Sequence, residues 1–125
     1  MPKVPARASV SGQVRVFYRI VRTDPPTDAD FTSNAAKGKQ PRRPDPEVLR
    51  LWGGISVYDT LRQARITAQT FPYLGRHSAI LHVPDDGSVQ FEQTLEPAKG
   101  HYTLWGTPSV LRAMAIGMAR FDVVH

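Results

Sequence analysis

The sequence contains no cysteine among its 125 residues. This absence excludes disulfides, thiolate metal ligands and cysteine nucleophiles, and it favours an intracellular, cytoplasmic location. Long apolar runs are also missing, because no stretch approaches the ~18 consecutive apolar residues of a membrane span. The N-terminal segment MPKVPARASV lacks the apolar core of a signal peptide. We therefore expect a protein that does not enter a membrane.

The short motifs that mark common catalytic and nucleotide-binding sites are absent as well. The sequence has no GxxxxGK[ST], GxGxxG, HExxH or GxSxG pattern. Its four histidines have no repeated ligand spacing. His77 and His82 are expected on opposite faces of one strand, where they cannot share a metal ion. We therefore expect no structural metal site.

What remains is the composition of a globular domain, with 41% hydrophobic and 22% charged residues. The net charge of +5 is unevenly placed. Much of the excess lies in two segments that we expect to be irregular, a flexible tail at 1–11 and a long loop at 24–45. The part of the loop at 37–43 is therefore a candidate surface for an acidic protein or a nucleic acid, or simply a solvated loop. The basic residues of the two segments are Lys3, Arg7, Lys37, Lys39, Arg42 and Arg43.

The chain is organised around residues 52–71, WGGISVYDTLRQARITAQTF. Residues 55–58 are mostly β-branched or aromatic, which predicts a strand. A helix follows, with Asp59 or Thr60 as its N-cap and apolar residues at helical spacing. Alternation along the strand places Ser56 and Tyr58 on the same side. This hydroxyl pair beside two glycines is either a ligand-binding edge or the solvent face of an ordinary strand.

Residues 13–21, QVRVFYRIV, predict a central strand, because both faces carry apolar side chains. Arg19 lies near the end of this strand. A guanidinium in that position needs a carboxylate, a carbonyl or an anionic ligand, and Asp59 is a structural candidate. The long loop at 24–45 is expected to be disordered or to cover a site as a lid. Phe31 is its one obvious apolar anchor.

The second half of the chain mixes predicted strands and helices. A short helix at 46–52 starts after Asp45 as N-cap. We expect a hairpin from 77 to 94, a further strand at 101–105, and a last helix that starts after Thr107. The fold class is therefore α+β, a single domain at 1–125 with a mixed, mostly antiparallel sheet and two to three helices. The last helix is expected to carry Val110, Leu111, Met114, Ala115 and Met118 on one stripe, and a final strand to contain Phe121, Val123 and Val124.

Several polar residues stand at the expected strand edges, and each also has an ordinary structural interpretation. A solvated acid on an alternating strand accounts for Glu92, and an exposed loop end accounts for His101. A structural ion pair accounts for Arg19. The candidate site residues are Arg19, Ser56, Tyr58, Glu92, His101 and Tyr102.

Taken together, the motifs resemble the ADP-ribosyltransferase-like superfamily and, within it, the RES-domain toxins. The motifs are the early strand FYRIV with its arginine, the strand GISVYDT that runs into a helix, and a distal strand with a glutamate. The resemblance covers residues 13–105. The sequence departs from the family pattern because it lacks a Ser-Thr-Ser triplet. Residues Gln90-Phe91-Glu92 match the QxE pattern of the family in residue type only.

The resemblance implies an ADP-ribosyltransferase-like fold and an enzyme that uses NAD, either transferring ADP-ribose or degrading NAD, as a toxin or effector. It implies that Arg19 holds NAD, that Ser56 or Tyr58 lines the nicotinamide pocket, and that the loop at 24–45 closes as a lid. The implied catalytic residues are Glu92, which supports the ribosyl cation, and Arg19; the implied cofactor-binding residues are Arg19, Ser56, Tyr58, His101 and Tyr102.

Two alternatives remain beside this hypothesis. The first is a non-catalytic module that binds nucleic acid or protein through the basic loop, with Lys37, Lys39, Arg42 and Arg43 as its contacts. The second is an interaction protein with an exposed apolar patch around Trp52 or Trp105.

Overall fold

A six-stranded sheet in the order β4-β5-β2-β1-β3-β6 forms the centre of the molecule. It belongs to a computed structural model that describes residues 13–43, 45–94 and 100–121. All the strand pairings in these ranges are antiparallel, so the predicted α+β domain is confirmed and its sheet is antiparallel rather than mixed. The strands are β1 (Val14–Val21), β2 (Ile55–Tyr58), β3 (His77–Pro84), β4 (Gln90–Gln93), β5 (His101–Trp105) and β6 (Ala115–Arg120).

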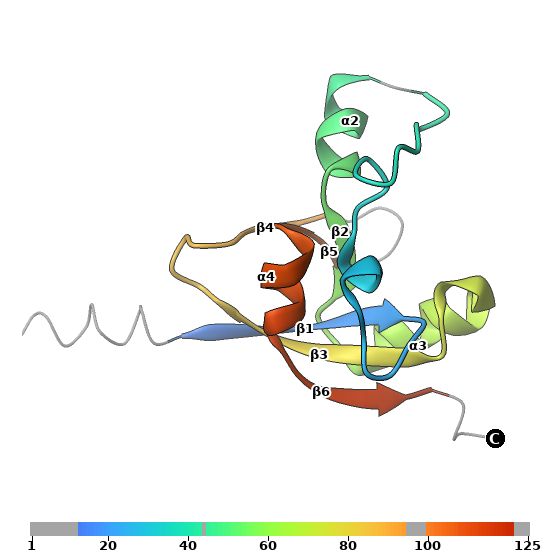
Figure 1. Ribbon diagram of the computed structural model, residues 1–125, viewed down its shortest axis with the longest axis vertical. Coiled ribbons are helices and arrows are strands. Elements are labelled where there is room, and N and C mark those ends of the chain that lie inside the picture. The colour runs from blue at the N-terminus through green and yellow to red at the C-terminus, as the bar shows by residue number, and fades with distance from the viewer. Residues whose placement is uncertain (1–12, 44, 95–99, 122–125) are drawn as a thin grey trace, which may run out of the picture.

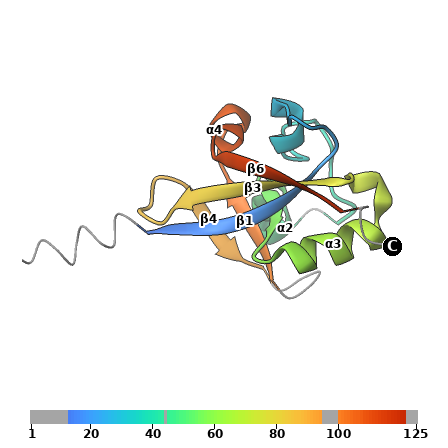
Figure 2. The same ribbon diagram turned by 90° about the horizontal axis from the view of Figure 1, so that it is seen from below.

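Helices cover both faces of this sheet (Figure 2). One face packs against α4 and the 3-10 turn η1 through Leu111 and Phe31, which belong to the larger core cluster. The other face packs against α3 through Ala64 and Ala68. The predicted tail at 1–11 lies outside the described residues. The helices are α2 (Pro46–Trp52), α3 (Leu61–Thr70) and α4 (Pro108–Ala113), with 3-10 turns η1 (Asp28–Phe31) and η2 (Pro72–Leu74).

Local signals in the sequence account for several of these elements. The side chain of Asp45 accepts a hydrogen bond from the amide of Val48 at the start of α2, and Thr60 accepts one from Gln63 at the start of α3. The predicted anchor Phe31 is confirmed, since it is 1% exposed. Burying such a side chain contributes roughly 1.5–3 kcal/mol, which holds η1 against the core. None of the helices in the described ranges combines the length and apolar character that crossing a membrane requires.

The predicted hairpin at 77–94 is wrong. β3 pairs along one edge with β1 and along the other with β6. Both of its edges are therefore occupied, and β4 pairs instead with β5 at the far end of the sheet. Figure 1 shows the chain leaving the end of β3 to reach this position. A turn signal in the sequence at 84–87 marks where the strand ends but not where the next one pairs.

The predicted helix after Thr107 forms, but its expected extent to Met118 is wrong, because α4 ends at Ala113 and the chain continues as β6. The chain forms a strand here because one edge of β3 is left free by β1. Residues 115–120 pair with β3, and His82 donates its amide hydrogen to the carbonyl oxygen of Met114. The apolar spacing around Met118 fits a helix or a strand, so it could not distinguish the two. Of the predicted final strand, Phe121 is buried, whereas Val123 and Val124 lie outside the described residues.

β1 is a central strand, as predicted. It pairs with β3 along its whole length but with β2 at one position, where Tyr18 faces Tyr58. The two strands therefore separate beyond this pair. Arg19 lies next to the point of separation, and α2 with the segment before it stands beyond the sheet at this end (Figure 1).

Candidate functional site

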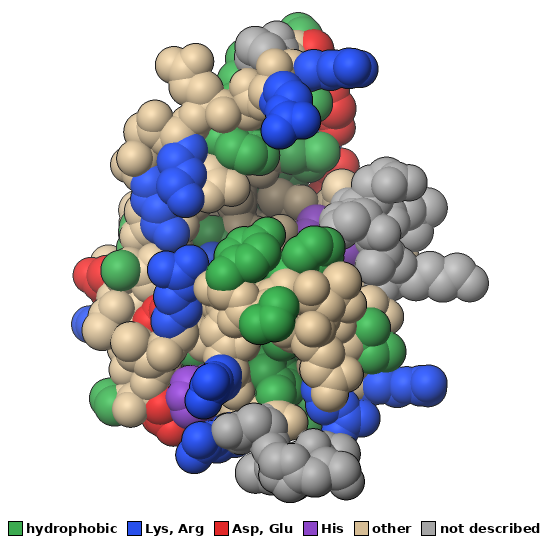
Figure 3. Space-filling view, turned by 90° about the vertical axis from the view of Figure 1, so that its right-hand side faces the viewer, with side chains coloured by type: hydrophobic (Ala, Val, Ile, Leu, Met, Phe, Trp, Pro, Cys, Tyr) green, Lys and Arg blue, Asp and Glu red, His purple; other side chains and the backbone are tan. Residues whose placement is uncertain are grey.

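A cleft of about 880 Å³ opens where β1 and β2 separate. Its walls are the end of β1, η1 and the loop after it, the last residue of α2, β2 and η2. The space-filling view shows this face hollowed, with Lys and Arg side chains along one side of the hollow (Figure 3). Small-molecule sites have volumes in this range. The cleft is therefore the candidate site.

Arg19 fills the gap between the separating strands. Its Nε donates to the carbonyl oxygen of Asp30 at 3.0 Å, and its Nη1 donates to the carbonyl oxygen of Ser56 at 2.9 Å. Burial lowers the pKa of Arg19 to about 10, against the opposing charges of Tyr58 and Asp30, so the guanidinium remains charged at neutral pH. Among the described residues no carboxylate forms an ion pair with it. The partners of Arg19 are thus two carbonyls, one of the expected possibilities, and not the carboxylate of the candidate Asp59.

Three more cations line the same cleft, namely Arg22, Lys37 and Lys39. Burial lowers the pKa of Lys37, and the nearby charges of Arg19, Lys39 and Arg22 lower it further. The shift thus reflects burial first and the neighbouring like charges second. The positive potential they create favours an anionic ligand.

Asp30 is the only acidic residue among the described residues that line the cleft. Its carboxylate accepts hydrogen bonds from the hydroxyl of Thr23 at 2.6 Å and from the amides of Thr27 and Arg22 at 2.9 Å each. Burial acts to raise the pKa of Asp30, but these hydrogen bonds and the charge of Arg19 lower it overall. The carboxylate therefore organises the loop around η1 and only partly offsets the positive charge.

Ser56 and His101 meet on neighbouring strands. The Oγ of Ser56 lies 2.8 Å from Nε2 of His101, and Nδ1 of the same ring lies 3.1 Å from the carbonyl oxygen of Thr94. Burial lowers the pKa of His101, although the hydrogen bond with Thr94 acts against the shift. The ring is therefore neutral at neutral pH, where it can accept a proton.

Tyr58 is the partner of His101 in the β2–β5 register, and their rings meet edge to face at 5.5 Å between centroids. Tyr58 is buried and lines the cleft. Burial raises the pKa of Tyr58, even though a hydrogen bond with Thr67 and the charge of Arg19 act to lower it. The phenol therefore stays protonated and fixes the position of the His101 ring.

No family model, curated protein or solved structure matches the chain. Its function is therefore argued from the cleft. The structure brings together four of the predicted site residues. The cleft is lined by Arg19, Ser56 and Tyr58, and His101 contacts Ser56 from outside the cleft lining.

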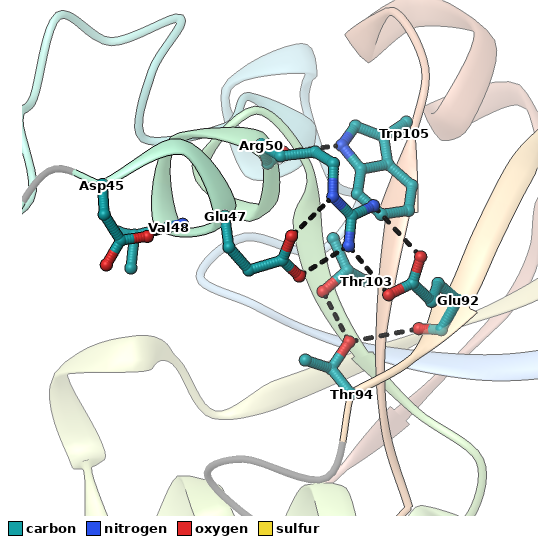
Figure 4. A network of polar contacts seen from close by, with 8 residues as sticks. All are labelled: Asp45, Glu47, Val48, Arg50, Glu92, Thr94, Thr103 and Trp105. Carbon is teal, nitrogen blue, oxygen red and sulfur yellow. Dashed lines mark hydrogen bonds and ion pairs between the residues drawn. The ribbon is translucent and has the colours of Figure 1, made fainter.

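The other two predicted residues lie elsewhere. Glu92 is outside the cleft lining, and its carboxylate accepts hydrogen bonds from Arg50 at 3.0 and 2.9 Å (Figure 4). Tyr102 packs on the opposite face of the sheet, against the ring of Phe17 at 4.9 Å. Its hydroxyl accepts a hydrogen bond from Arg15 at 3.1 Å. Neither side chain reaches the cleft from these positions.

The basic residues of the loop at 37–43 also lie partly inside and partly outside the cleft lining. Lys37 and Lys39 line the cleft, whereas Arg42 and Arg43 are exposed and outside its lining. Trp52, expected as part of an apolar patch, also lines the cleft, with its Nε1 donating to the carbonyl oxygen of Lys39 at 2.9 Å.

Tyr73 is a cleft residue that the sequence did not indicate. It sits in the turn after α3, lines the cleft and is 67% exposed. An exposed aromatic ring at the edge of a cleft is a surface for a planar ligand group. The sequence feature nearest to Tyr73 is the proline before it, which indicates a turn but not a ligand site.

Proposed function

We propose that the cleft binds a phosphate-bearing dinucleotide and that the protein is an NAD-using enzyme of ADP-ribosyltransferase-like architecture. The observation that carries the proposal is Arg19, a charged and partly buried guanidinium with two carbonyl partners and no ion pair among the described residues. A buried charge of this kind is costly unless an opposite charge joins it. A pyrophosphate would supply that charge.

The remaining cations and aromatics of the cleft fit the same ligand. Lys37 and Lys39 add charge to hold phosphate oxygens, and the donor fork of Arg19 suits paired oxygens. Trp52 and Tyr73 line the cleft and offer ring surfaces for the planar groups of a dinucleotide. A lone sulfate-sized anion would leave most of the volume of about 880 Å³ empty.

The ADP-ribosyltransferase-like part of the proposal rests on the placement of two residues. An arginine on the first strand lies beside a serine on a middle strand, joined by the hydrogen bond from Arg19 to the carbonyl of Ser56. This juxtaposition agrees with the roles that the resemblance gives the two residues. Loss of nicotinamide would leave a cation-like ribose. A group that stabilises this positive charge lowers the barrier only if it does so in the transition state. The resemblance gives that role to Glu92, but its carboxylate is bound by Arg50 outside the cleft lining, so the proposal does not depend on Glu92.

Calorimetric titration of the full chain with NAD tests the proposal. We expect Arg19→Gln to weaken binding at least tenfold, because hydrogen bonds to charged groups contribute about 1.5–3 kcal/mol. Arg15→Gln is the matched control: it removes the same charge from the same strand but outside the cleft lining. Circular dichroism verifies that both variants fold.

Two outcomes would contradict the proposal. One is an absence of NAD binding by the wild-type chain at millimolar concentration. The other is an equal loss of affinity in Arg15→Gln and Arg19→Gln, which would report net charge rather than a site. Release of nicotinamide, followed by chromatography, then separates turnover from binding alone.

A further inference from the structure

The hydrogen-bond chain from Ser56 through His101 to Thr94 fixes the direction in which a proton can move. The carbonyl oxygen of Thr94 can only accept, so Nδ1 of His101 carries the hydrogen. In a neutral ring Nε2 is then an acceptor, and the hydroxyl of Ser56 must donate to it across 2.8 Å. The serine proton is thus already directed at a base.

Both the hydroxyl and the carbonyl oxygen of Ser56 are hydrogen-bonded. His101 binds its hydroxyl at 2.8 Å, while Arg19 binds its carbonyl oxygen at 2.9 Å. His101 is 5% exposed, and Tyr58 packs edge-on against its ring, so the base cannot turn away. Ser56 itself is partly exposed and lines the cleft. A hydroxyl next to a fixed base, oriented by a third group, is the arrangement of an activated nucleophile.

Anion binding does not require this arrangement. The cations of the cleft act without His101, and a partly exposed serine can satisfy its hydroxyl with water. The imidazole of His101 is buried with both ring nitrogens hydrogen-bonded, and the partner of its Nε2 is a serine that lines the cleft. The pair therefore suggests chemistry at Ser56 itself.

We propose that Ser56 is a nucleophile that attacks the ligand of the cleft, with His101 as its general base. The inference rests on the proposed function. With NAD, Oγ of Ser56 forms a bond to C1′ of the nicotinamide ribose, and the bond from C1′ to the nicotinamide nitrogen breaks. Nicotinamide leaves as a neutral molecule with the electron pair of that bond. The hydroxyl proton passes to Nε2 of His101, and Ser56 carries one ADP-ribosyl group.

Intact-mass spectrometry of the full chain after incubation with NAD tests this step. We expect a mass increase of a single ADP-ribosyl group, which peptide mapping places on Ser56 and which Ser56→Ala abolishes. Ser109→Ala is the control, since Ser109 is an exposed serine of α4 outside the cleft lining. His101→Gln, or His101→Asn if the first variant does not fold, should slow the modification by about 10²-fold or more while NAD affinity is kept.

A second probe makes failure of this inference distinguishable from failure of the proposed function. A fluorophosphonate needs no NAD site: Oγ attacks phosphorus, the phosphorus–fluorine bond breaks, fluoride leaves, and the proton passes to His101. Labelling of Ser56 that depends on His101, with no NAD binding, would support the nucleophile and reject NAD as its ligand. NAD binding without labelling by either reagent would overturn the inference and leave the proposed function standing. An adduct that persists in Ser56→Ala would overturn it as well.

Discussion

Glu92 and Arg50 form two hydrogen bonds, of 2.9 and 3.0 Å, that join β4 to α2. Arg50 also binds Glu47 at 2.7 Å, and its guanidinium lies over the ring of Trp105 at 5.4 Å (Figure 4). The indole of Trp105 in turn donates to the carbonyl oxygen of Arg50 at 3.1 Å. These contacts fix α2 against the edge of the sheet, and α2 ends in Trp52, which lines the cleft.

The engagement of Glu92 by Arg50 leads to the first prediction. Glu92→Gln should leave NAD affinity within about twofold and lower the melting temperature only slightly, because exposed ion pairs contribute little. We also expect nicotinamide release to continue at a similar rate, since the carboxylate lies outside the cleft lining. Calorimetry, thermal melting and chromatography measure the three effects. A loss of release by about 10²-fold with binding intact would instead support the catalytic role that the resemblance implies.

Gly54 gives a second prediction, because it lines the cleft where β2 approaches β5. A Cβ added there would lie 2.5 Å from Cγ2 of Thr103 and 3.1 Å from the carbonyl oxygen of Leu104. The methyl group of Thr103 belongs to a short, buried, β-branched side chain and the oxygen of Leu104 to the backbone, so neither can yield easily and Gly54→Ala should destabilise the fold by about 1–3 kcal/mol. Urea denaturation measures this free energy of unfolding.

The neighbouring glycine is the control for that change. At Gly53 an added Cβ has its nearest contact at 3.6 Å, with the carbonyl oxygen of Arg50, and φ is −78°. Gly53→Ala should therefore be neutral within about 0.5 kcal/mol. If both variants were equally destabilised, close approach of β2 and β5 would not be the reason that glycine is needed at Gly54.

The central stretch at 52–71 could be predicted from the sequence because its signals are local. The β-branched and aromatic residues at 55–58 predicted the strand, and Thr60, one of two expected candidates, is the N-cap of the helix. The partner of Arg19 was also among those expected, since carbonyls were named beside carboxylates and anions. Each of these inferences concerns one segment and its immediate surroundings.

The pairings between distant segments could not be predicted in this way. The partner of β4 depends on which strand edges remain free after β1 and β6 have occupied both edges of β3. The contact between Ser56 and His101 spans 45 residues. It exists because the β2–β5 register sets Tyr58 opposite His101, which places Ser56 diagonally across on the same face. The sequence contains both residues of the pair but no signal for that register.

The buried imidazole predicts how stability depends on pH. Burial lowers the pKa of His101 in the folded chain below the ordinary histidine value of about 6.5, so the unfolded chain binds the proton more tightly. The contribution of His101 to the free energy of unfolding is therefore fully present above about pH 6.5, and it is lost as the pH falls below that value. Thermal melting between pH 8 and pH 5 should show this decrease, and His101→Gln should reduce it.

His82→Gln is the control for the pH experiment, because it removes an exposed imidazole from β3. It should retain the decrease seen in the wild type. A second loss at lower pH is expected from Asp30, whose pKa is lowered overall in the folded chain. Its contribution is present above the unfolded value of about 3.8 and disappears as the pH falls through the folded value. A wild-type stability that stayed constant from pH 8 to pH 5 would contradict a buried neutral His101.

The last prediction uses the division of the basic loop. A double variant Lys37→Gln/Lys39→Gln removes two charges from the cleft, and Arg42→Gln/Arg43→Gln removes two from the same loop outside the cleft lining. The first should weaken NAD binding roughly tenfold, because charges close to phosphate oxygens contribute about 1 kcal/mol even in water. The second should change affinity by less than about twofold at 0.15 M salt, where the Debye length is ≈ 8 Å. Calorimetry at two salt concentrations tests both. An equal effect of the two variants, together with tight salt-dependent binding to nucleic acid, would favour the alternative in which the loop at 37–43 is the functional surface.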